Sequence, residues 1–186
     1  MYDKANINGT IISITKDDLT MMDVEAIVFY ANKDLSLGSG YGNAISTRGG
    51  PSIKKELDAM IKPGISDVVI SSAGNLKAEY ILHAVGPAFQ EIDVEVKLRK
   101  AIDNAFLKAE DKGIKFIAFP IMGTGFYGVS PDVSIDIMFE SVKNYLQKKS
   151  KIKEIIFCGN DNREYRLLEK KLDIMKRRRH DKITGK

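Results

Sequence analysis

Two glycine-rich segments are the part of this sequence best suited to chemistry. The first, residues 38–42 (G-S-G-Y-G), follows the apolar run 26–31, and the second, residues 123–128 (G-T-G-F-Y-G), follows the apolar run 116–121. Glycine permits positive φ angles and close approach of the backbone to a ligand, so N–H groups in such loops can converge on an anion. Two loops at one crevice would suit a diphosphate better than a single phosphate. The alternative that both segments are only tight turns is left open by spacing alone.

The second segment also matches the dinucleotide-binding pattern G-x-G-x-x-G between a predicted strand and a predicted helix. A Rossmann domain needs further strand–helix units downstream of this motif, but only one strand is predicted after it. The acidic residue expected about 20 positions further on is also missing, because residues 147–149 read Q-K-K. What remains is an anion-binding loop at the carboxyl end of a strand, which is where open α/β sheets bind ligands.

The elements that must position these loops alternate between buried strands and amphipathic helices. Continuous apolar runs predict strands with both faces covered. Apolar residues at helical spacing predict the helices, with Pro51 and Pro131 at helix starts and Gly113 at a helix end. The predicted strands are 8–15, 26–31, 68–70, 80–82, 116–121 and 155–158, and the predicted apolar helix faces lie within 53–61, 98–109, 135–146 and 165–175. This order predicts an α/β fold with three layers, α/β/α.

The composition is that of one globular domain. With 186 residues, 44% of them hydrophobic and 29% charged, the chain can bury a sizeable core. No apolar run reaches the roughly 18 residues that span a bilayer, and the polar N-terminus lacks the apolar centre of a signal peptide. Cys158 is the single cysteine, which excludes an internal disulfide framework and a multi-cysteine zinc site. We therefore expect a cytoplasmic protein with no membrane partner.

The net charge of +4 is concentrated at the C-terminus. Residues 176–186 carry six Lys or Arg and one Asp, a net +5, which leaves −1 for residues 1–175. We therefore divide the chain into a single domain, residues 1–175, and a basic tail, residues 176–186, that we expect to be disordered. A nearly neutral body argues against a broad nucleic-acid-binding face, so nucleic acid would bind only through the tail.

Four motifs occur in order along the chain. They are V-E-A-I-V-x-x-A-N (24–32), L-G-S-G-Y-G-N-A-I (37–45), Y-I-L-H-A-V-G-P (80–87) and I-A-F-P-I-M-G-T-G-F-Y-G (117–128). Together they resemble the macro domain family, the ADP-ribose-binding module, from about residue 9 to residue 172. The resemblance implies a macro-type α/β/α sandwich with a central mixed sheet, a pocket for ADP-ribose, free or attached to a protein, and no metal or cofactor.

Carried over position by position, the resemblance implies a role for each residue of the site. Asp18 would accept a hydrogen bond from the adenine amino group, and Leu19 would offer backbone contacts beside it. Asn32 would hydrogen-bond the hydroxyl groups of the distal ribose, while Phe126 and Tyr127 would wall that ribose. The diphosphate would lie between the two loops, against Gly38, Gly40, Tyr41, Gly42, Gly123, Thr124, Gly125 and Gly128.

Three positions depart from the family's usual pattern. Residues 29–32 read F-Y-A-N in place of N-A-A-N, so only the second asparagine, Asn32, remains. Gly42 stands where many hydrolytic members carry Asp. Asn160 stands where members often stack an aromatic side chain on the adenine, a contact worth about 1–3 kcal/mol per base.

These departures favour ADP-ribose binding as the function. The alternative is a hydrolase, with Asn32 as the candidate catalytic residue, that removes ADP-ribose from proteins or processes ADP-ribose 1″-phosphate by substrate-assisted attack of water. RNA binding through the tail, with an unused pocket, is the least favoured alternative. His83 is interpreted as a core histidine, Cys158 as a small buried side chain without an activating partner, and Asp17 as a turn residue.

Overall fold

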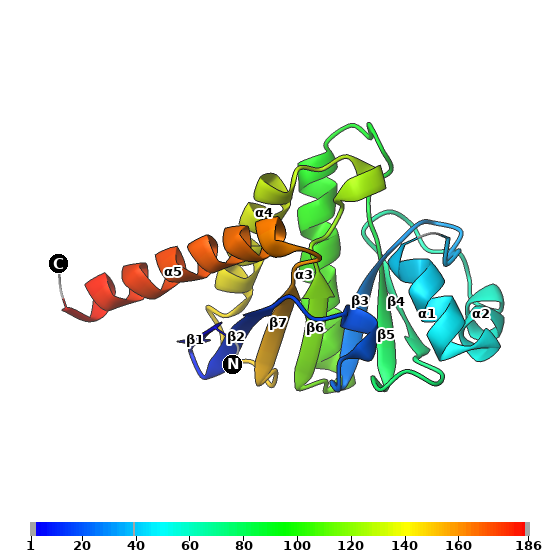
Figure 1. Ribbon diagram of the computed structural model, residues 1–186, viewed down its shortest axis with the longest axis horizontal. Coiled ribbons are helices and arrows are strands. Elements are labelled where there is room, and N and C mark those ends of the chain that lie inside the picture. Colours follow the sequence, from blue (N-terminus) through cyan, green and yellow to red (C-terminus); the bar gives the residue numbers. More distant parts are fainter. Residues whose placement is uncertain (1–2, 39, 185–186) are drawn as a thin grey trace.

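The chain folds around a mixed sheet that contains seven strands within the described residues, 3–38 and 40–184, of this computed structural model (Figure 1). The strands are β1 (Asp3–Ile7), β2 (Thr10–Thr15), β3 (Ala26–Ala31), β4 (Val68–Ser72), β5 (Tyr80–Val85), β6 (Phe116–Pro120) and β7 (Glu154–Cys158). Their order in the sheet is β1-β2-β7-β6-β3-β5-β4. The five inner strands are parallel, and β1 and β4 are antiparallel at the two edges. The predicted mixed sheet is confirmed.

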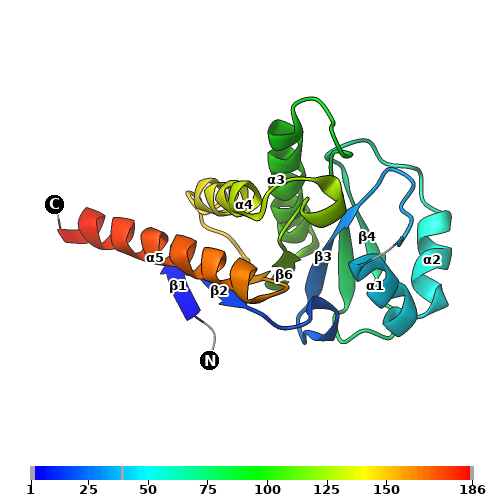
Figure 2. The same cartoon turned by 45° about the horizontal axis from the view of Figure 1, so that its top comes forward.

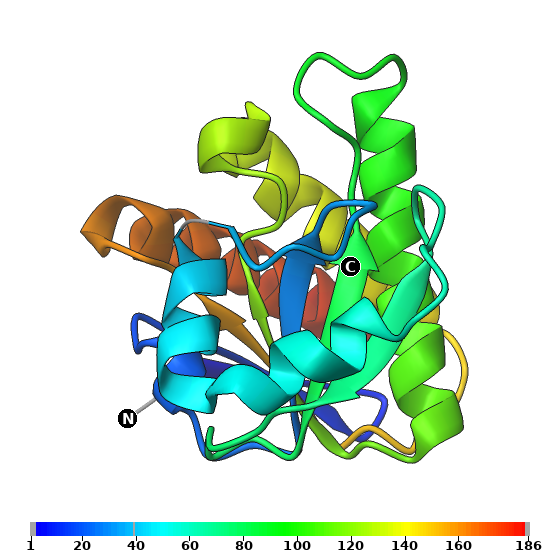
Figure 3. The same ribbon diagram turned by 90° about the vertical axis from the view of Figure 1, so that its right-hand side faces the viewer.

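Helices cover both faces of the sheet, which confirms the three-layer architecture (Figures 1 and 3). The buried side chains of α1 and α2 belong to one apolar cluster, and those of α3, α4 and α5 belong to the other. The helices are α1 (Tyr41–Gly49), α2 (Pro51–Asp58), α3 (Val94–Lys112), α4 (Pro131–Tyr145) and α5 (Asn162–Thr184), with 3₁₀ turns η1 (Leu19–Met21) and η2 (Gly125–Tyr127). None of these described helices is long and apolar enough to cross a membrane.

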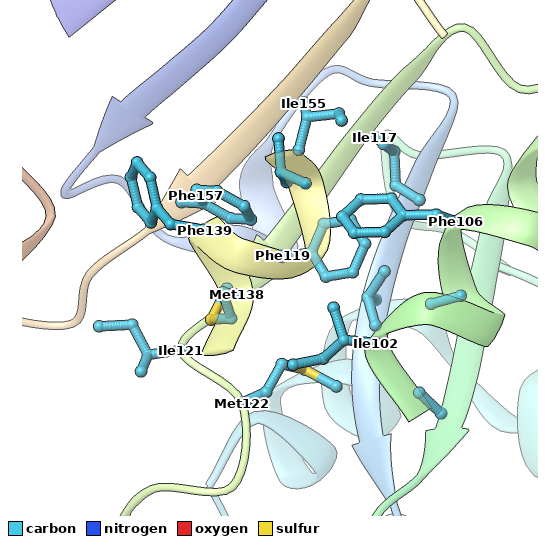
Figure 4. Packing of buried hydrophobic residues seen from close by; sticks show 14 of the residues in the cluster. Ile102, Phe106, Ile117, Phe119, Ile121, Met122, Met138, Phe139, Ile155 and Phe157 are labelled. Carbon is cyan, nitrogen blue, oxygen red and sulfur yellow. The ribbon is translucent and has the colours of Figure 1, made fainter. Parts of the chain in front are cut away.

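The central strand β3 feeds both cores because alternate side chains point to opposite faces. Its residues 26, 28 and 30 join the cluster under α3 and α4, and residues 27, 29 and 31 join the cluster under α1 and α2. Phe119 of β6 has its ring 4.9 Å from Phe106 of α3 and 5.9 Å from Phe157 of β7 (Figure 4). These rings fix the sheet to its helices, so that the strand ends are held in place.

One strand was not predicted, and one expectation about a helix was wrong. The strand β1 was not predicted, because Asp3–Ile7 mixes charged and apolar residues and pairs only at the edge of the sheet. Ile61 was assigned to an apolar helix face, but α2 ends at Asp58 and Ile61 is 93% exposed. The helical spacing of apolar residues continues to Ile61, but the helix itself ends at Asp58.

The helix α5 continues to Thr184, through most of the segment for which the sequence predicts a disordered tail. Figures 1 and 2 show this last part of α5 reaching beyond the edge strand β1. Residues 185–186 lie outside the described residues, and side chains are described only as far as Arg177. The division into a domain of residues 1–175 and a tail stays a prediction.

Candidate functional site

The loops that follow β3 and β6 lie side by side at the centre of the sheet. The two strands are parallel neighbours, so their carboxyl ends meet at the same edge. After β3 the chain passes to α1 on one face, and after β6 it passes to α4 on the other. Such a reversal leaves a crevice outside the strand ends, which is the usual ligand site of an open α/β sheet. Figure 3 shows both loops above the upper ends of their strands.

The first glycine loop leads into the start of α1. Gly40 precedes the helix at φ 60°, and no described side chain caps the first N–H groups of α1. Gly42 lies within the first turn, where a Cβ atom would fall 1.6 Å from the carbonyl oxygen of Leu37. Glycine at 42 is therefore required by contact with the loop rather than by backbone angle. Ser39 lies outside the described residues.

Gly38, at φ 36°, precedes Ser39 in the first loop, and the second glycine loop forms the short turn η2. Thr124 precedes η2 without a side-chain cap, and its hydroxyl donates to the carbonyl of Ile121 at 3.2 Å. Gly123, Gly125 and Gly128 have φ angles of 75°, 64° and 81°. A Cβ at Gly128 would meet the ring of Phe89 at 2.6 Å, so the loop after β5 packs against this turn. Phe126 is 85% exposed.

At one end of the crevice, Asn32 follows β3 as predicted. Its Nδ2 donates to Ser36 Oγ at 2.7 Å, and the Ser36 N–H donates to its Oδ1 at 3.1 Å. Tyr30 takes the position of the first alanine in the family's N-A-A-N pattern, next to Phe29 at the first asparagine. Its hydroxyl donates to the Pro87 carbonyl at 2.6 Å, and its ring centre lies 4.3 Å from that of Tyr127. Tyr30 was not among the predicted site residues; its place in the altered N-A-A-N motif was the signal.

At the other end, Asp18 caps η1. Its Oδ1 accepts from the N–H of Thr20 at 2.9 Å and from the Thr20 hydroxyl at 2.7 Å, and its Oδ2 accepts from Arg48 Nη1 at 2.5 Å. Burial alone would raise the pKa of Asp18, but the hydrogen bonds from Arg48 and Thr20 outweigh it and hold that pKa below its usual value. Leu19, predicted to offer backbone contacts beside Asp18, is fully buried.

Two polar contacts join α1 to the strand ends opposite it. Arg48 reaches Asp18 after β2, and the Tyr41 hydroxyl donates to Asn160 Oδ1 after β7 at 2.5 Å. Tyr41 and Arg48 are seven positions apart in one helix and therefore share a face. Arg48 was missed, since nothing in the sequence placed it near Asp18.

The other polar candidates have structural surroundings. His83 is fully buried with its Nε2 2.8 Å from Ser71 Oγ, while its Nδ1 has no hydrogen-bond partner among the described residues. Burial lowers the pKa of His83 to about 4 and raises that of the buried Cys158, so neither side chain is an exposed base or thiolate. Asp17 accepts a hydrogen bond from the Thr15 hydroxyl at 2.7 Å. In the described part of the chain, no group of three or more acidic, His or Cys side chains could hold a metal ion.

Fold and site together define a three-layer α/β/α domain with two glycine loops at the carboxyl ends of neighbouring parallel strands. The family model "Macro domain" matches residues 28–138. The chain therefore belongs to the macro domain family.

Relatives and solved structures resemble this chain over most of its length. An uncharacterized protein of Saccharolobus solfataricus is 37% identical over 82% of this chain and 87% of its own. O-acetyl-ADP-ribose deacetylase 1 of Pantoea vagans is 32% identical over 87% of this chain and 98% of its own. The Oceanobacillus iheyensis macrodomain with ADP superposes with a TM-score of 0.87, at 26% identity over 94% of this chain and 96% of that one. The Trypanosoma brucei macrodomain in complex with ADP-ribose gives 0.80, at 25% identity over 86% and 68%.

Proposed function

We propose that this protein binds ADP-ribose, free or attached to a protein, in the crevice at the carboxyl ends of β3 and β6. The observation that carries the proposal is the meeting of two helix starts there, α1 at Tyr41 and η2 at Gly125, neither of which is capped by a described side chain. The first N–H groups of α1 are available to an anion, and the start of this nine-residue helix favours negative charge. The three-residue turn η2 adds backbone N–H groups without a helix dipole of its own. A diphosphate has enough oxygen atoms to accept hydrogen bonds from both loops.

Groups suited to the remaining parts of ADP-ribose flank this anion site. Asp18 offers carboxylate oxygens for the adenine amino group, and Asn32, which both donates and accepts, suits ribose hydroxyls. Tyr127, whose ring is tilted by 48° against that of Tyr30, supports the distal wall. Macrodomains solved with ADP and with ADP-ribose add support from related proteins.

The hydrolytic alternative is not favoured. A carboxylate at position 42 would need a Cβ where the Leu37 carbonyl stands, so this chain cannot carry the acidic side chain of many hydrolytic relatives without a different loop path. Replacing Gly42 by Asp is for the same reason no test of catalysis. Although one relative is named as a deacetylase, the conclusion for this chain stops at binding. The protein-linked form of the ligand and the cytoplasmic location rest on the sequence.

Calorimetry with ADP-ribose tests the proposal, with turnover of a mono-ADP-ribosylated protein followed in parallel. We expect one site per chain and release much slower than a median enzyme turnover of roughly 10 per second. Gly125→Val should weaken binding about tenfold or more, because it strains η2 at φ 64° and turns its N–H groups away.

Gly113→Val is the matched control. Gly113 also has a positive φ, 81°, and open space around it, but it ends α3 away from the crevice. Gly113→Val should lower the free energy of unfolding and leave the affinity for ADP-ribose unchanged. Absence of ADP-ribose binding by the wild type would refute the proposal.

A further inference from the structure

The adenine end of the crevice has no aromatic side chain directly after β7. Residues 159–163 read G-N-D-N-R, and the first aromatic residue beyond them is Tyr165. Tyr165 packs against the cluster on the α3–α5 face, and its pKa is raised by burial and by the nearby Asp3 of β1. It therefore lies on the wrong face to stack on a base held beside Asp18.

Tyr41 brings an aromatic ring to this end from the opposite wall. It packs against the apolar cluster that includes Leu19 and Cys158, and its hydroxyl donates to Asn160 Oδ1. Burial raises the pKa of Tyr41, and the nearby Cys158, Asp18 and Glu164 raise it further. These neighbours place the phenol among the carboxyl ends of β2 and β7 and the start of α5.

The acceptor of this hydrogen bond is itself fixed. The Asn160 N–H donates to Glu164 Oε2 at 2.7 Å, and the Glu164 N–H donates to Asp161 Oδ1 at 2.8 Å. This reciprocal capping at the start of α5 sets the backbone of residues 160–164. Asn160 is thereby a rigid point to which the Tyr41 side chain is tied.

We propose that Tyr41 supplies the aromatic surface on which the adenine ring stacks, and that Asn160 positions that ring through its hydrogen bond. This inference rests on the proposed function. Tyr41 is also the first residue of α1, so its ring stands beside the N–H groups offered to the diphosphate. Tyr41 thus takes part in recognition of both the diphosphate and the base. The aromatic side chain that stacks on adenine comes from the start of α1 in this chain, and not from the residue after β7.

Stacking and hydrogen bonding divide the recognition of the base. Every purine has a π-face, so Tyr41 contributes affinity without distinguishing adenine from hypoxanthine. Asp18 accepts hydrogen bonds only, so it favours the adenine amino group over the hypoxanthine oxo group. Loss of the Tyr41 ring should therefore weaken binding of ADP-ribose and of inosine-diphosphate ribose by the same factor.

Tyr41→Trp provides a direct readout, because the chain contains no tryptophan. Stacking on adenine should change the fluorescence of this single Trp on addition of ADP-ribose or ADP, and ribose 5-phosphate should have no effect. Tyr80→Trp is the control, since Tyr80 begins β5 at the opposite edge of the sheet and its fluorescence should not respond. A Tyr41→Trp protein that binds ADP-ribose with unchanged fluorescence overturns the inference.

Affinities measured by calorimetry test the same point in the unlabelled protein. Tyr41→Ala should lose about tenfold or more for ADP-ribose and ADP and nothing for ribose 5-phosphate. Tyr41→Phe and Asn160→Ala should each lose about twofold to fivefold, and the double variant no more than either alone, because both remove one hydrogen bond. Additive losses overturn the positioning role of Asn160.

Two further outcomes separate this inference from the proposed function. If wild type binds ADP-ribose and Tyr41→Ala binds it equally well, or loses ribose 5-phosphate to the same extent, only the stacking role fails. If wild type does not bind ADP-ribose, the proposed function fails first. Thermal unfolding of each variant identifies a loss of fold, and Tyr41→Phe and Tyr41→Trp then decide.

Discussion

The two ends of the proposed ADP-ribose site, a distal end at Asn32 and an adenine end at Asp18, are held in different ways. At the distal end, Asn32 bonds within its own loop to Ser36, and Tyr30 is 7% exposed and packed against Tyr127. At the adenine end, Asp18 and Arg48 form an ion pair whose side chains are 43% and 44% exposed. An exposed ion pair contributes only about 0–1 kcal/mol. The distal end is thus preorganised by packing, whereas the adenine end can exchange partners when a ligand arrives.

The largest effect should come from a change that disturbs both ends at once. Gly42→Ala places a Cβ against the Leu37 carbonyl, so the start of α1 and the loop from Asn32 must move apart. We expect a loss of about 3 kcal/mol in the free energy of unfolding and weak binding of every ligand part. Gly38→Ala, with open space around its Cβ, should cost less. Urea unfolding measures both, and an unchanged Gly42→Ala would contradict the steric assignment.

Acid should weaken the packed support beneath the distal end. His83 lies with its ring 5.9 Å from Phe29 of β3, and burial lowers its pKa to about 4 from 6.5. As the pH falls, His83 takes up a proton in the unfolded chain before it does so in the folded protein. The stability that neutral, buried His83 contributes is therefore fully present above about pH 6.5 and is lost toward pH 4. Between pH 7 and pH 5, wild type should lose about 2 kcal/mol more than His83→Gln. Parallel pH profiles would contradict a neutral buried His83.

Asp18→Ala should affect the adenine end alone. It removes a hydrogen bond to a charged group, worth roughly 1.5–3 kcal/mol, so affinity for ADP-ribose should fall about tenfold or more. Ribose 5-phosphate, which has no adenine, should bind unchanged, and Asp17→Ala is the neighbouring carboxylate control. Calorimetry with both ligands makes the comparison; equal losses would mean that Asp18 only supports the fold.

Asn32→Ala is the counterpart at the distal end. It should weaken ADP-ribose by about threefold to tenfold and leave ADP, which has no distal ribose, unaffected. Any slow turnover should fall by more than the affinity does, because orientation by the amide is felt most in the transition state. An equal effect on ADP would show that Asn32 shapes the whole loop.

The smallest effect should follow removal of residues 177–186, which belong to neither end. Among the described side chains of α5, the last that pack in the core are Leu172 and Met175, both before this segment. The melting temperature and ADP-ribose affinity should stay nearly unchanged, whereas salt-sensitive binding to polyanions should largely disappear. RNA binding that keeps its salt dependence after truncation would contradict the placement of charge in the tail.

Much of the fold could be predicted because a strand buried on both faces produces a continuous apolar run in the local sequence. The runs 26–31 and 116–121 and the helix starts at Pro51 and Pro131 needed no tertiary information. The edge strand β1 could not be predicted, since an edge needs little apolar content. Ile61 was mispredicted because the spacing of apolar residues does not show where a helix ends.

The site was predictable where one loop makes it and not where distant segments meet. Asn32 and the glycine loops follow their strands directly, so their place at the sheet edge could be foreseen. The pairs Arg48–Asp18 and Tyr41–Asn160 join residues 30 and 119 positions apart, and no local pattern indicates them. The lack of space for a side chain at Gly42 likewise depends on the position of the Leu37 backbone, which local sequence does not indicate.

The strand order also sets when binding competence arises during synthesis. Because β2 lies between β1 and β7, the amino-terminal hairpin joins the sheet only when β7 is available. Contacts so distant in sequence form late, since long loops must close first. Residues 26–130 contain both helix starts of the anion site, whereas the adenine side waits for residues 154–164. A nascent chain halted before β7 would carry the distal half alone, so adenine recognition marks a completed sheet.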